Sequence, residues 1–377
     1  METKLRDRTY RASCASLGIY SASVIALPIC LVAISKELGF SLTQSGALGL
    51  FASVVQFVML ISSSFFAARF GKIRVIRGGL VVLAAGLVLF ILSKSWIHAA
   101  LLMLVIGAGS ALLDALLTPI VEDLYPKDDG SKMNLLHAFW PVGTLVSVLL
   151  LGQLLTIGVS WRYLFTGIAV VMLLVMFWFP SSRKIRLPAN RTDFSHMGEI
   201  LSLRRFWLFG SALGFAGGAE GAFTFWSASY IQLSFDQLPR AGAFGTAAFA
   251  LGMAIGRFSS SRIAGKIGLR RLIIISLLCG VLASGGFFFV RNLYTLYAFF
   301  GGDRTLYCHA LAEHPVVCRL PARSRPDHPD DISFLLRPSR FQFGDIHHGR
   351  YRGPVGPARE FHRRAGLHPL CAHFDAY

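Results

Sequence analysis

Two basic segments decide the fold: Ser64-Phe-Phe-Ala-Ala-Arg-Phe-Gly-Lys-Ile-Arg74 and Ser261-Arg-Ile-Ala-Gly-Lys-Ile-Gly-Leu-Arg-Arg271. Each lies between two long apolar runs, so the chain repeats a helix-loop-helix unit at membrane depth. An internal repeat of this kind is typical of membrane transporters built from two related halves. The sequence therefore predicts two halves, or at least the beginning of a second one.

The composition agrees with a membrane location. Apolar residues make up 54% of the chain and charged residues only 15%, whereas a soluble domain carries about 25% charged residues. Mean hydropathy is +0.56. We therefore expect an all-α, polytopic membrane protein embedded in the lipid bilayer.

Nine apolar runs approach or exceed the length of about 20 residues that crosses a bilayer. A tenth begins at Leu293 and stops near Gly302. The first run is too long for a signal-peptide core and lacks a small-residue cleavage site, so we expect it to remain as a helix. The nine runs cover residues 11–35, 45–68, 78–93, 96–121, 135–157, 163–179, 206–232, 241–261 and 272–289.

The positions of Lys and Arg predict the orientation. With the N-terminus in the cytoplasm, the cytoplasmic segments hold twenty of the twenty-six basic residues before Gly302. This asymmetry follows the positive-inside rule, so the net charge of +17 indicates orientation and not nucleic-acid binding. We expect a bacterial-type inner membrane protein with a cytoplasmic N-terminus.

The longest cytoplasmic loop follows the sixth run and marks the join between the halves, where a flexible connection lets them rock against each other. The predicted organisation is a six-helix lobe over residues 1–179, a loop over 180–205, an incomplete second lobe over 206–302 and a tail over 303–377.

The first basic segment resembles the loop between the second and third helices of the major facilitator superfamily, Gly-x-Leu-Ala-Asp-Arg-x-Gly-Arg-Lys/Arg. Here Ser64 and Ala68 replace the usual Gly and Asp. The resemblance implies the two-lobe fold of that superfamily and a role for both loops in changes of conformation. The residues that carry this role are Arg69, Gly71, Lys72, Arg74, Lys266, Gly268 and Arg270.

A narrower resemblance covers residues 107–143 and the motif Gly217-Gly-Ala-Glu-Gly-Ala-Phe-Thr-Phe-Trp226. These stretches are similar to the fucose-permease-like branch, which contains sugar-proton symporters. Thr118 stands where relatives often have Asn. The resemblance implies a small sugar-like solute and protons as partners, and places Trp226 and Thr118 among the site candidates.

Two carboxylates lie deep in apolar runs. Asp114 lies about five residues from the centre of the fourth run, and Glu220 lies near the middle of the seventh. A charge at such depth costs at least about 2.5 to 3.5 kcal/mol, so each should face a cavity or a partner. Low-dielectric surroundings favour the neutral form of a carboxylic acid, which suits proton exchange near neutral pH. The alternative is an interhelical hydrogen bond that only fixes packing, and glycines around Glu220 would permit such close packing.

Other candidates have stronger structural interpretations. His137 could titrate near neutral pH or contact solute, but its place near the cytoplasmic end favours a structural role. Trp140, Phe223 and Trp226 could stack on a sugar, although packing is the default interpretation of aromatic residues in such helices.

The chain changes character after Gly302. Residues 303–377 hold eight of the eleven His and eight of the fifteen Pro, with no run of spanning length. A cytosolic regulatory domain and a metal-binding tail using His347 and His348 are two interpretations. The favoured one is translation in a shifted reading frame, giving a disordered tail outside the membrane.

The sequence thus favours a monomeric proton-coupled carrier of a small organic solute that works by alternating access and is inactive in this shortened form. Proton-driven efflux of amphipathic compounds is the alternative on the same fold, and a non-transporting remnant is an alternative of another class. No cofactor or metal site is predicted, because the cysteines lack zinc-site spacing. No enzymatic motif stands out.

Overall fold

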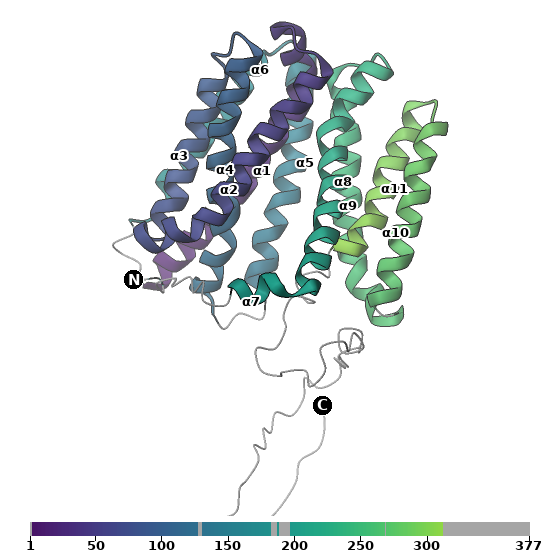
Figure 1. Cartoon of the computed structure of the whole chain (residues 1–377). Helices are drawn as coiled ribbons and strands as arrows, with labels where there is room; N and C mark the ends of the chain where they lie inside the picture. The colour runs from purple at the N-terminus through teal and green to yellow at the C-terminus, as the bar shows by residue number, and fades with distance from the viewer. Residues whose placement is uncertain (1, 127–129, 182–186, 188–196, 268, 312–377) are drawn as a thin grey trace, which may run out of the picture. The chain divides into compact units, whose positions relative to one another are not determined.

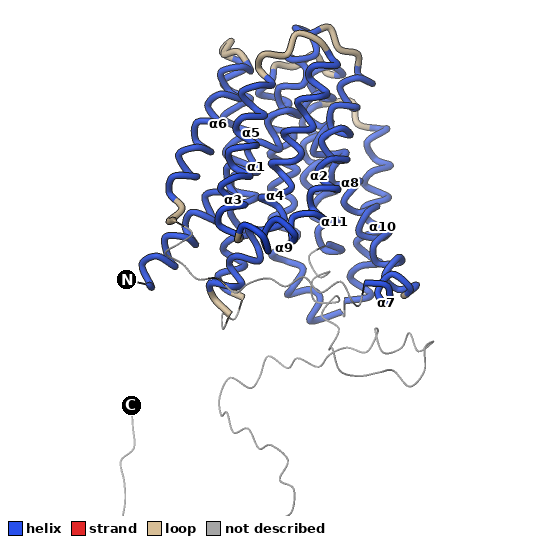
Figure 2. Tube along the Cα trace, turned by 60° about the vertical axis from the view of Figure 1, so that its left-hand side comes forward, coloured by secondary structure: helices blue, strands red, loops and turns tan. Residues whose placement is uncertain are grey.

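The computed structural model describes residues 2–126, 130–181, 187, 197–267 and 269–311, which all belong to one compact unit. In these ranges every regular element is helical, and long helices run side by side with short loops between them (Figures 1 and 2). The expected tail beyond Leu311 and most of the predicted inter-lobe loop lie outside the described residues. The helices are α1 (Glu2–Leu38), α2 (Leu42–Phe70), α3 (Lys72–Phe90), α4 (Trp96–Leu124), α5 (Ser131–Thr156), α6 (Trp161–Trp178), α7 (Met197–Ser202), α8 (Arg204–Ser234), α9 (Pro239–Ile267), α10 (Leu269–Gly286), the 3₁₀-helix η1 (Phe287–Phe289) and α11 (Leu293–Leu311).

The predicted apolar runs coincide with the long helices, but the helices are longer than the runs. Helix α1 begins at Glu2, nine residues before the apolar run. The tenth apolar run stops near Gly302, whereas α11 continues to Leu311. An apolar run marks the part of a helix that hydrocarbon can surround. The helix itself continues until its backbone hydrogen bonds end.

Six helices of the described part, α1 to α6, are long and apolar enough to cross a membrane. Helix α2 shows why such a helix needs lipid: it exposes Leu50, Phe57, Val58 and Ile61 along its length. A row of exposed apolar side chains on a helix whose backbone bonds are internally satisfied is suited to a hydrocarbon surrounding. The helices after the join, α8 to α11, have 31, 29, 18 and 19 residues.

Glycines let α4 pack closely against two neighbours. A Cβ atom added at Gly107 would lie 2.3 Å from the carbonyl oxygen of Ala52 in α2. One added at Gly109 would lie 2.5 Å from the backbone nitrogen of Leu83 in α3. Only glycine permits both approaches, so α4 is held between α2 and α3 in a fixed register. This packing positions Asp114, one turn further along α4.

Polar contacts fasten the first six helices at both ends. At the end where α1 begins, the Tyr125 hydroxyl donates to Asp7 Oδ1 at 2.8 Å, and the Tyr10 hydroxyl donates to the Lys132 carbonyl at 2.9 Å. At the other end, Trp161 Nε1 donates to Glu37 Oε2 at 2.6 Å. The contacts join α1 to the helices α4, α5 and α6 and so hold α1 in place along its length.

The helices on either side of the join pack through α5 against α9 and α1 against α8. The contact between α5 and α9 is close at Gly152, where an added Cβ would lie 2.2 Å from the Ala243 Cβ. The backbone nitrogen of Arg240 also donates to Thr156 Oγ1 at 2.9 Å. Four helices, α1, α5, α8 and α9, therefore meet around a common space.

Candidate functional site

A partly enclosed cavity lies where these four helices meet. It contains about 440 Å³ of space free of protein atoms, part of which is open to the surroundings. The lining residues are Ser21, Val24, Ile25, Trp140, Thr144, Glu220, Thr224, Thr246, Phe249, Ala250 and Met253.

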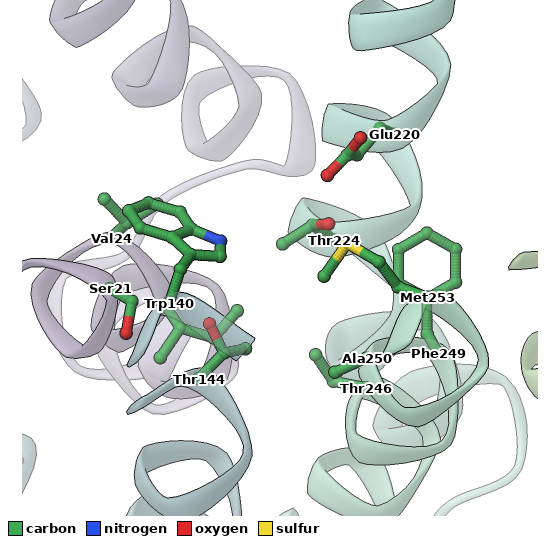
Figure 3. A pocket seen from close by; sticks show the side chains of 11 residues that line it. Ser21, Val24, Trp140, Thr144, Glu220, Thr224, Thr246, Phe249, Ala250 and Met253 are labelled. Atoms are coloured by element: carbon green, nitrogen blue, oxygen red, sulfur yellow. The ribbon is translucent and has the colours of Figure 1, made fainter. Parts of the chain in front are cut away.

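The two sides of the cavity differ in chemistry. Trp140 of α5 faces Glu220 and Thr224 of α8 across the space (Figure 3). One side therefore presents an indole ring, and the other a carboxylate with a hydroxyl. An aromatic face opposite hydrogen-bonding groups suits a small molecule that has one apolar and one polar face.

Hydroxyl groups provide most of the remaining polarity. Ser21 Oγ donates to the Gly18 carbonyl at 2.7 Å, and Thr246 Oγ1 lies 2.7 Å from Ser227 Oγ. A hydroxyl has one donor and two acceptor positions. Ser21 has thus committed its proton to the backbone but keeps acceptor capacity for a donor on a bound molecule.

Glu220 is the charged residue among the lining residues, and it lies near the middle of α8. It is sixteen residues from the start of α8 and fourteen from its end, or roughly 24 Å and 21 Å along the axis. The side chain is half-buried. A carboxylate at such depth is expensive in hydrocarbon, and the cavity supplies the polar surrounding that its position requires.

Asp114 is exposed and lies outside the lining of the cavity. Its carboxylate is hydrogen-bonded to the Gln56 side chain. Gln56 Nε2 in turn donates to the Tyr20 hydroxyl at 3.3 Å. The structure therefore separates the two predicted carboxylates: Glu220 contributes to the cavity, whereas Asp114 contacts residues of α1 and α2.

The other predicted solute contacts are also outside the lining. His137 is exposed, and Thr118 is half-buried. Trp226 is directed at α2, because a Cβ added at Gly46 would lie 3.0 Å from its indole ring. Phe223 packs among Phe249, Phe287 and Phe300. Of the aromatic candidates, Trp140 is the one that lines the cavity.

The first basic loop is organised around Lys72. Its turn needs Gly71, which adopts φ 85°, a conformation that side chains with a Cβ rarely take. Lys72 is 5% exposed, and its Nζ lies 2.6 Å from Asp123 Oδ2 and 3.4 Å from the Pro119 carbonyl oxygen. The resemblance implies a role for Lys72 in changes of conformation, and the structure buries it in an ion pair between α3 and α4.

The remaining loop candidates divide into two groups. Arg69, Arg74 and Lys266 are exposed, as expected of a basic surface next to lipid headgroups. Gly268 and the side chain of Arg270 lie outside the described residues. In the described part of the chain, no group of three His, Cys, Asp or Glu side chains is arranged to hold a metal ion.

The glycines around Glu220 do not form the close helix contact that their spacing allows. A Cβ added at Gly214, Gly217, Gly218 or Gly221 would meet no described atom within 4 Å. Among the described residues, the glycine face of α8 therefore shows no close contact of the kind seen at Gly107 and Gly109.

Comparison with known proteins identifies the family. Residues 12–308 match the sequence family described as the Major Facilitator Superfamily. The chain belongs to this superfamily. Its fold is therefore that of a family of membrane transporters and not of enzymes, and the chain is an integral membrane protein.

Similar proteins include an uncharacterised MFS-type transporter of Yersinia pestis, 26% identical over 218 residues. The match covers 57% of this chain and 55% of that protein, so the chain spans about half the length of its curated relative. Among solved structures, a bacterial homologue of the human lysosomal transporter Spinster, inward-facing and unoccupied, has a TM-score of 0.68 at 18% identity. That match covers 83% of this chain and 75% of the other.

The nucleoside transporter NupG is a second solved structure with this fold, with a TM-score of 0.66 at 12% identity. The match covers 82% of this chain and 80% of NupG. At these identities both structures indicate a shared fold and leave the solute of this superfamily member open.

The sequence interpretation missed most of the cavity lining. Ser21, Thr144, Thr224 and Thr246 are small hydroxyl residues, which are frequent in membrane helices and carry no distinguishing spacing. Gln56 had a usable signal, because it is a lone amide at the centre of the apolar helix α2. A polar side chain at that depth needs a partner, as an embedded charge does.

Proposed function

We propose that this superfamily member is a secondary transporter of a small organic, sugar-like solute, coupled to protons by alternating access. The observation that carries the proposal is the cavity between α1, α5, α8 and α9. A carboxylate, four hydroxyl side chains and an indole ring are the groups that a neutral polyhydroxyl compound needs for hydrogen bonding and stacking.

In this proposal Glu220 binds the solute or the coupled proton, and Asp114 serves as a second proton site. His137, Thr118 and Trp226 lie outside the cavity lining, so a role for them would belong to another conformation of the cycle. The N-terminus faces the cytoplasm of an inner membrane, following the positive-inside rule, and the carrier works as a monomer.

The experiment measures proton uptake on solute binding, which needs no sealed vesicle. The purified 377-residue chain in weakly buffered detergent receives a neutral hexose, fucose, galactose or glucose, while a pH indicator records proton exchange. A symporter takes up protons as hexose binds. Glu220→Gln and Asp114→Asn should each reduce the uptake, and their joint replacement should abolish it.

Glu122→Gln is the matched control, because Glu122 lies in the last turn of α4, away from the cavity. Control and wild-type chains should take up the same amount. Hexose binding with unchanged proton uptake in both single variants and in the double variant would contradict the proposed coupling.

Efflux of amphipathic cations is a second candidate, favoured by the apolar part of the lining, which includes Val24, Phe249 and Met253. The same apparatus separates the two, because binding of tetraphenylphosphonium to a proton antiporter releases protons where a symporter takes them up. The sign of the indicator change on adding each compound therefore decides between the candidates.

We also propose that the 377-residue chain binds solute without completing the transport cycle. In its described part, six helices precede the join and four long helices follow it, whereas alternating access needs two lobes that enclose the site in turn. Hexose binding in detergent, together with flux in proteoliposomes equal to that of empty vesicles, is the expected pair of results. Flux well above empty vesicles would contradict this part of the proposal.

A further inference from the structure

A chain of contacts links Asp114 to the wall of the cavity. Asp114 is hydrogen-bonded to Gln56, and Gln56 Nε2 donates to the Tyr20 hydroxyl at 3.3 Å. The Tyr20 ring meets the Trp140 ring edge to face, with centroids 5.1 Å apart and an interplanar angle of 67°. Trp140 lines the cavity, and Asp114 does not. The four side chains come from four different helices, α4, α2, α1 and α5.

The middle of this chain is tightly held. Tyr20 is 2% exposed, so its hydroxyl depends on a protein partner. Close by, α1 and α5 approach so nearly that a Cβ added at Gly143 would lie 2.4 Å from both the Gly18 carbonyl oxygen and Ser21 Oγ. In such a packed contact, a changed position of the Tyr20 ring is passed to Trp140 and is not absorbed by empty space.

The charge of Asp114 determines how firmly Gln56 is held. An ionised carboxylate only accepts hydrogen bonds, and a hydrogen bond to a charged acceptor is about twice as strong as a neutral one. When Asp114 is ionised, the Gln56 amino group is drawn to it and is oriented for its second bond, to Tyr20. When Asp114 is neutral, its own proton can be donated to Gln56 Oε1, which favours turning the amide and removes the donor from Tyr20.

Few other ionisable groups of the neighbouring helices lie near Asp114, Gln56 and Tyr20. The charged residues of α2 and α3 are Arg69, Lys72, Arg74 and Arg77, all within two turns of the α2–α3 junction. Helix α5 carries Lys132 and His137, the latter six residues from the start of the helix, or roughly 9 Å along its axis. Helix α1 contributes Tyr20, and Glu220 of α8 lies across the cavity from Trp140.

We propose that Gln56 and Tyr20 are positioning residues that transmit the charge state of Asp114 to Trp140, and through Trp140 to the solute cavity. The inference rests on the proposed role of Asp114 as a proton site. It gives that site a route to the solute through Trp140, so that proton binding at Asp114 changes the position of a side chain that lines the cavity.

The test follows Trp140 directly and needs neither solute nor transport. Tryptophan emission of the purified 377-residue chain in lipid nanodiscs is recorded between about pH 4 and pH 8, where carboxylates in such surroundings titrate. The difference between the wild-type chain and Trp140→Phe isolates the signal of Trp140. This signal should show one transition, which is lost in Asp114→Asn and retained at a shifted midpoint in Asp114→Glu.

Gln56→Leu and Tyr20→Phe should each lose the transition as well. Tyr20→Phe removes the hydroxyl but keeps the ring and its packing. It therefore tests the contact between Gln56 and Tyr20 even if Gln56→Leu does not elute as a single folded species. The matched controls are Gln153→Leu and Tyr163→Phe, which make the same changes at exposed positions on α5 and α6. Both controls should keep the wild-type transition.

Three results would overturn the inference. The first is a wild-type chain whose pH response is unchanged in Trp140→Phe. The second is a transition that survives in Gln56→Leu or Tyr20→Phe. The third is a transition lost in Glu220→Gln but kept in Asp114→Asn, because Trp140 would then sense the carboxylate across the cavity. Failure of hexose-linked proton uptake alone would contradict the proposed function and leave the fluorescence result intact, so the two failures are distinguishable.

Discussion

The buried ion pair between Lys72 and Asp123 allows a quantitative prediction. The two side chains are 4% and 15% exposed, with Lys72 Nζ 2.6 Å from Asp123 Oδ2. Removing one partner of a buried pair leaves an uncompensated charge and costs about 3 to 5 kcal/mol. In Asp123→Asn the amide oxygen and the Pro119 carbonyl can still accept from Lys72, so we expect the lower end, about 3 kcal/mol. This corresponds to more than a hundredfold shift in the unfolding equilibrium, at about 1.4 kcal/mol for each factor of ten.

The assay is reversible unfolding of the purified chain in mixed micelles of increasing SDS content, followed by tryptophan emission. Arg74→Met is the matched control, because Arg74 is exposed on the same first turn of α3. It should change stability by less than about 0.5 kcal/mol, as surface substitutions usually do. The double variant Lys72→Met with Asp123→Leu should recover most of the loss, since neither charge then remains buried. Equal stability of Asp123→Asn and Arg74→Met would refute the reasoning.

Two further predictions concern packing and orientation. Gly143→Ala should destabilise the chain by about 1 to 3 kcal/mol through overpacking, because the new Cβ would lie 2.4 Å from the Gly18 carbonyl oxygen. The control is Gly167→Ala, because nothing lies within 4 Å of a Cβ added there. Equal melting temperatures of the two variants would contradict the prediction. In a chain without other cysteines, Ser182→Cys should be shielded from an impermeant thiol reagent in intact cells while Gln237→Cys reacts; the reverse labelling would overturn the orientation.

The fold could be predicted from sequence because a segment that crosses a bilayer must be apolar over a known length. A span of apolar residues that cannot expose its backbone to lipid must be a helix, so the runs located the helices correctly. Helix ends were less predictable. Polarity limits the part of α11 that hydrocarbon would surround, but it does not stop the backbone bonds that carry the helix to Leu311.

The site was only half predictable, for a different reason. The positions of Asp114 and Glu220 within apolar runs identified them as residues that need a polar surrounding. Position along a run does not show which way a side chain points from its helix. Which carboxylate faces the cavity depends on the rotation of α4 and α8 about their axes, and that rotation is set by contacts with other helices. For α4 these contacts are the glycine approaches to α2 and α3 at Gly107 and Gly109.

The same argument explains why the burial of Lys72 could not be predicted. A lysine in a basic loop is normally a surface residue, and nothing in its neighbours along the chain distinguishes it from Arg69 or Arg74. Its burial depends on Asp123, which is fifty-one residues away and reaches it because α3 and α4 are antiparallel neighbours. Pairing between distant residues is a property of the packed helices, so the charge pattern of the loop alone could not show it.

The two carboxylates therefore have different surroundings, and a coupled carrier can use this difference. Glu220 lines the cavity, where in the proposed function it binds the solute or the coupled proton. Asp114 is exposed, lies outside the residues that line the cavity and neighbours Gln56. In the proposed route a proton bound at Asp114 changes the affinity of the cavity through the intervening side chains, and by linkage a bound solute must change the proton affinity of Asp114 by the same factor. Solute binding that leaves the pH midpoint of the Trp140 signal unmoved would thus exclude Asp114 from coupling, even if Gln56 and Tyr20 connect it to the cavity.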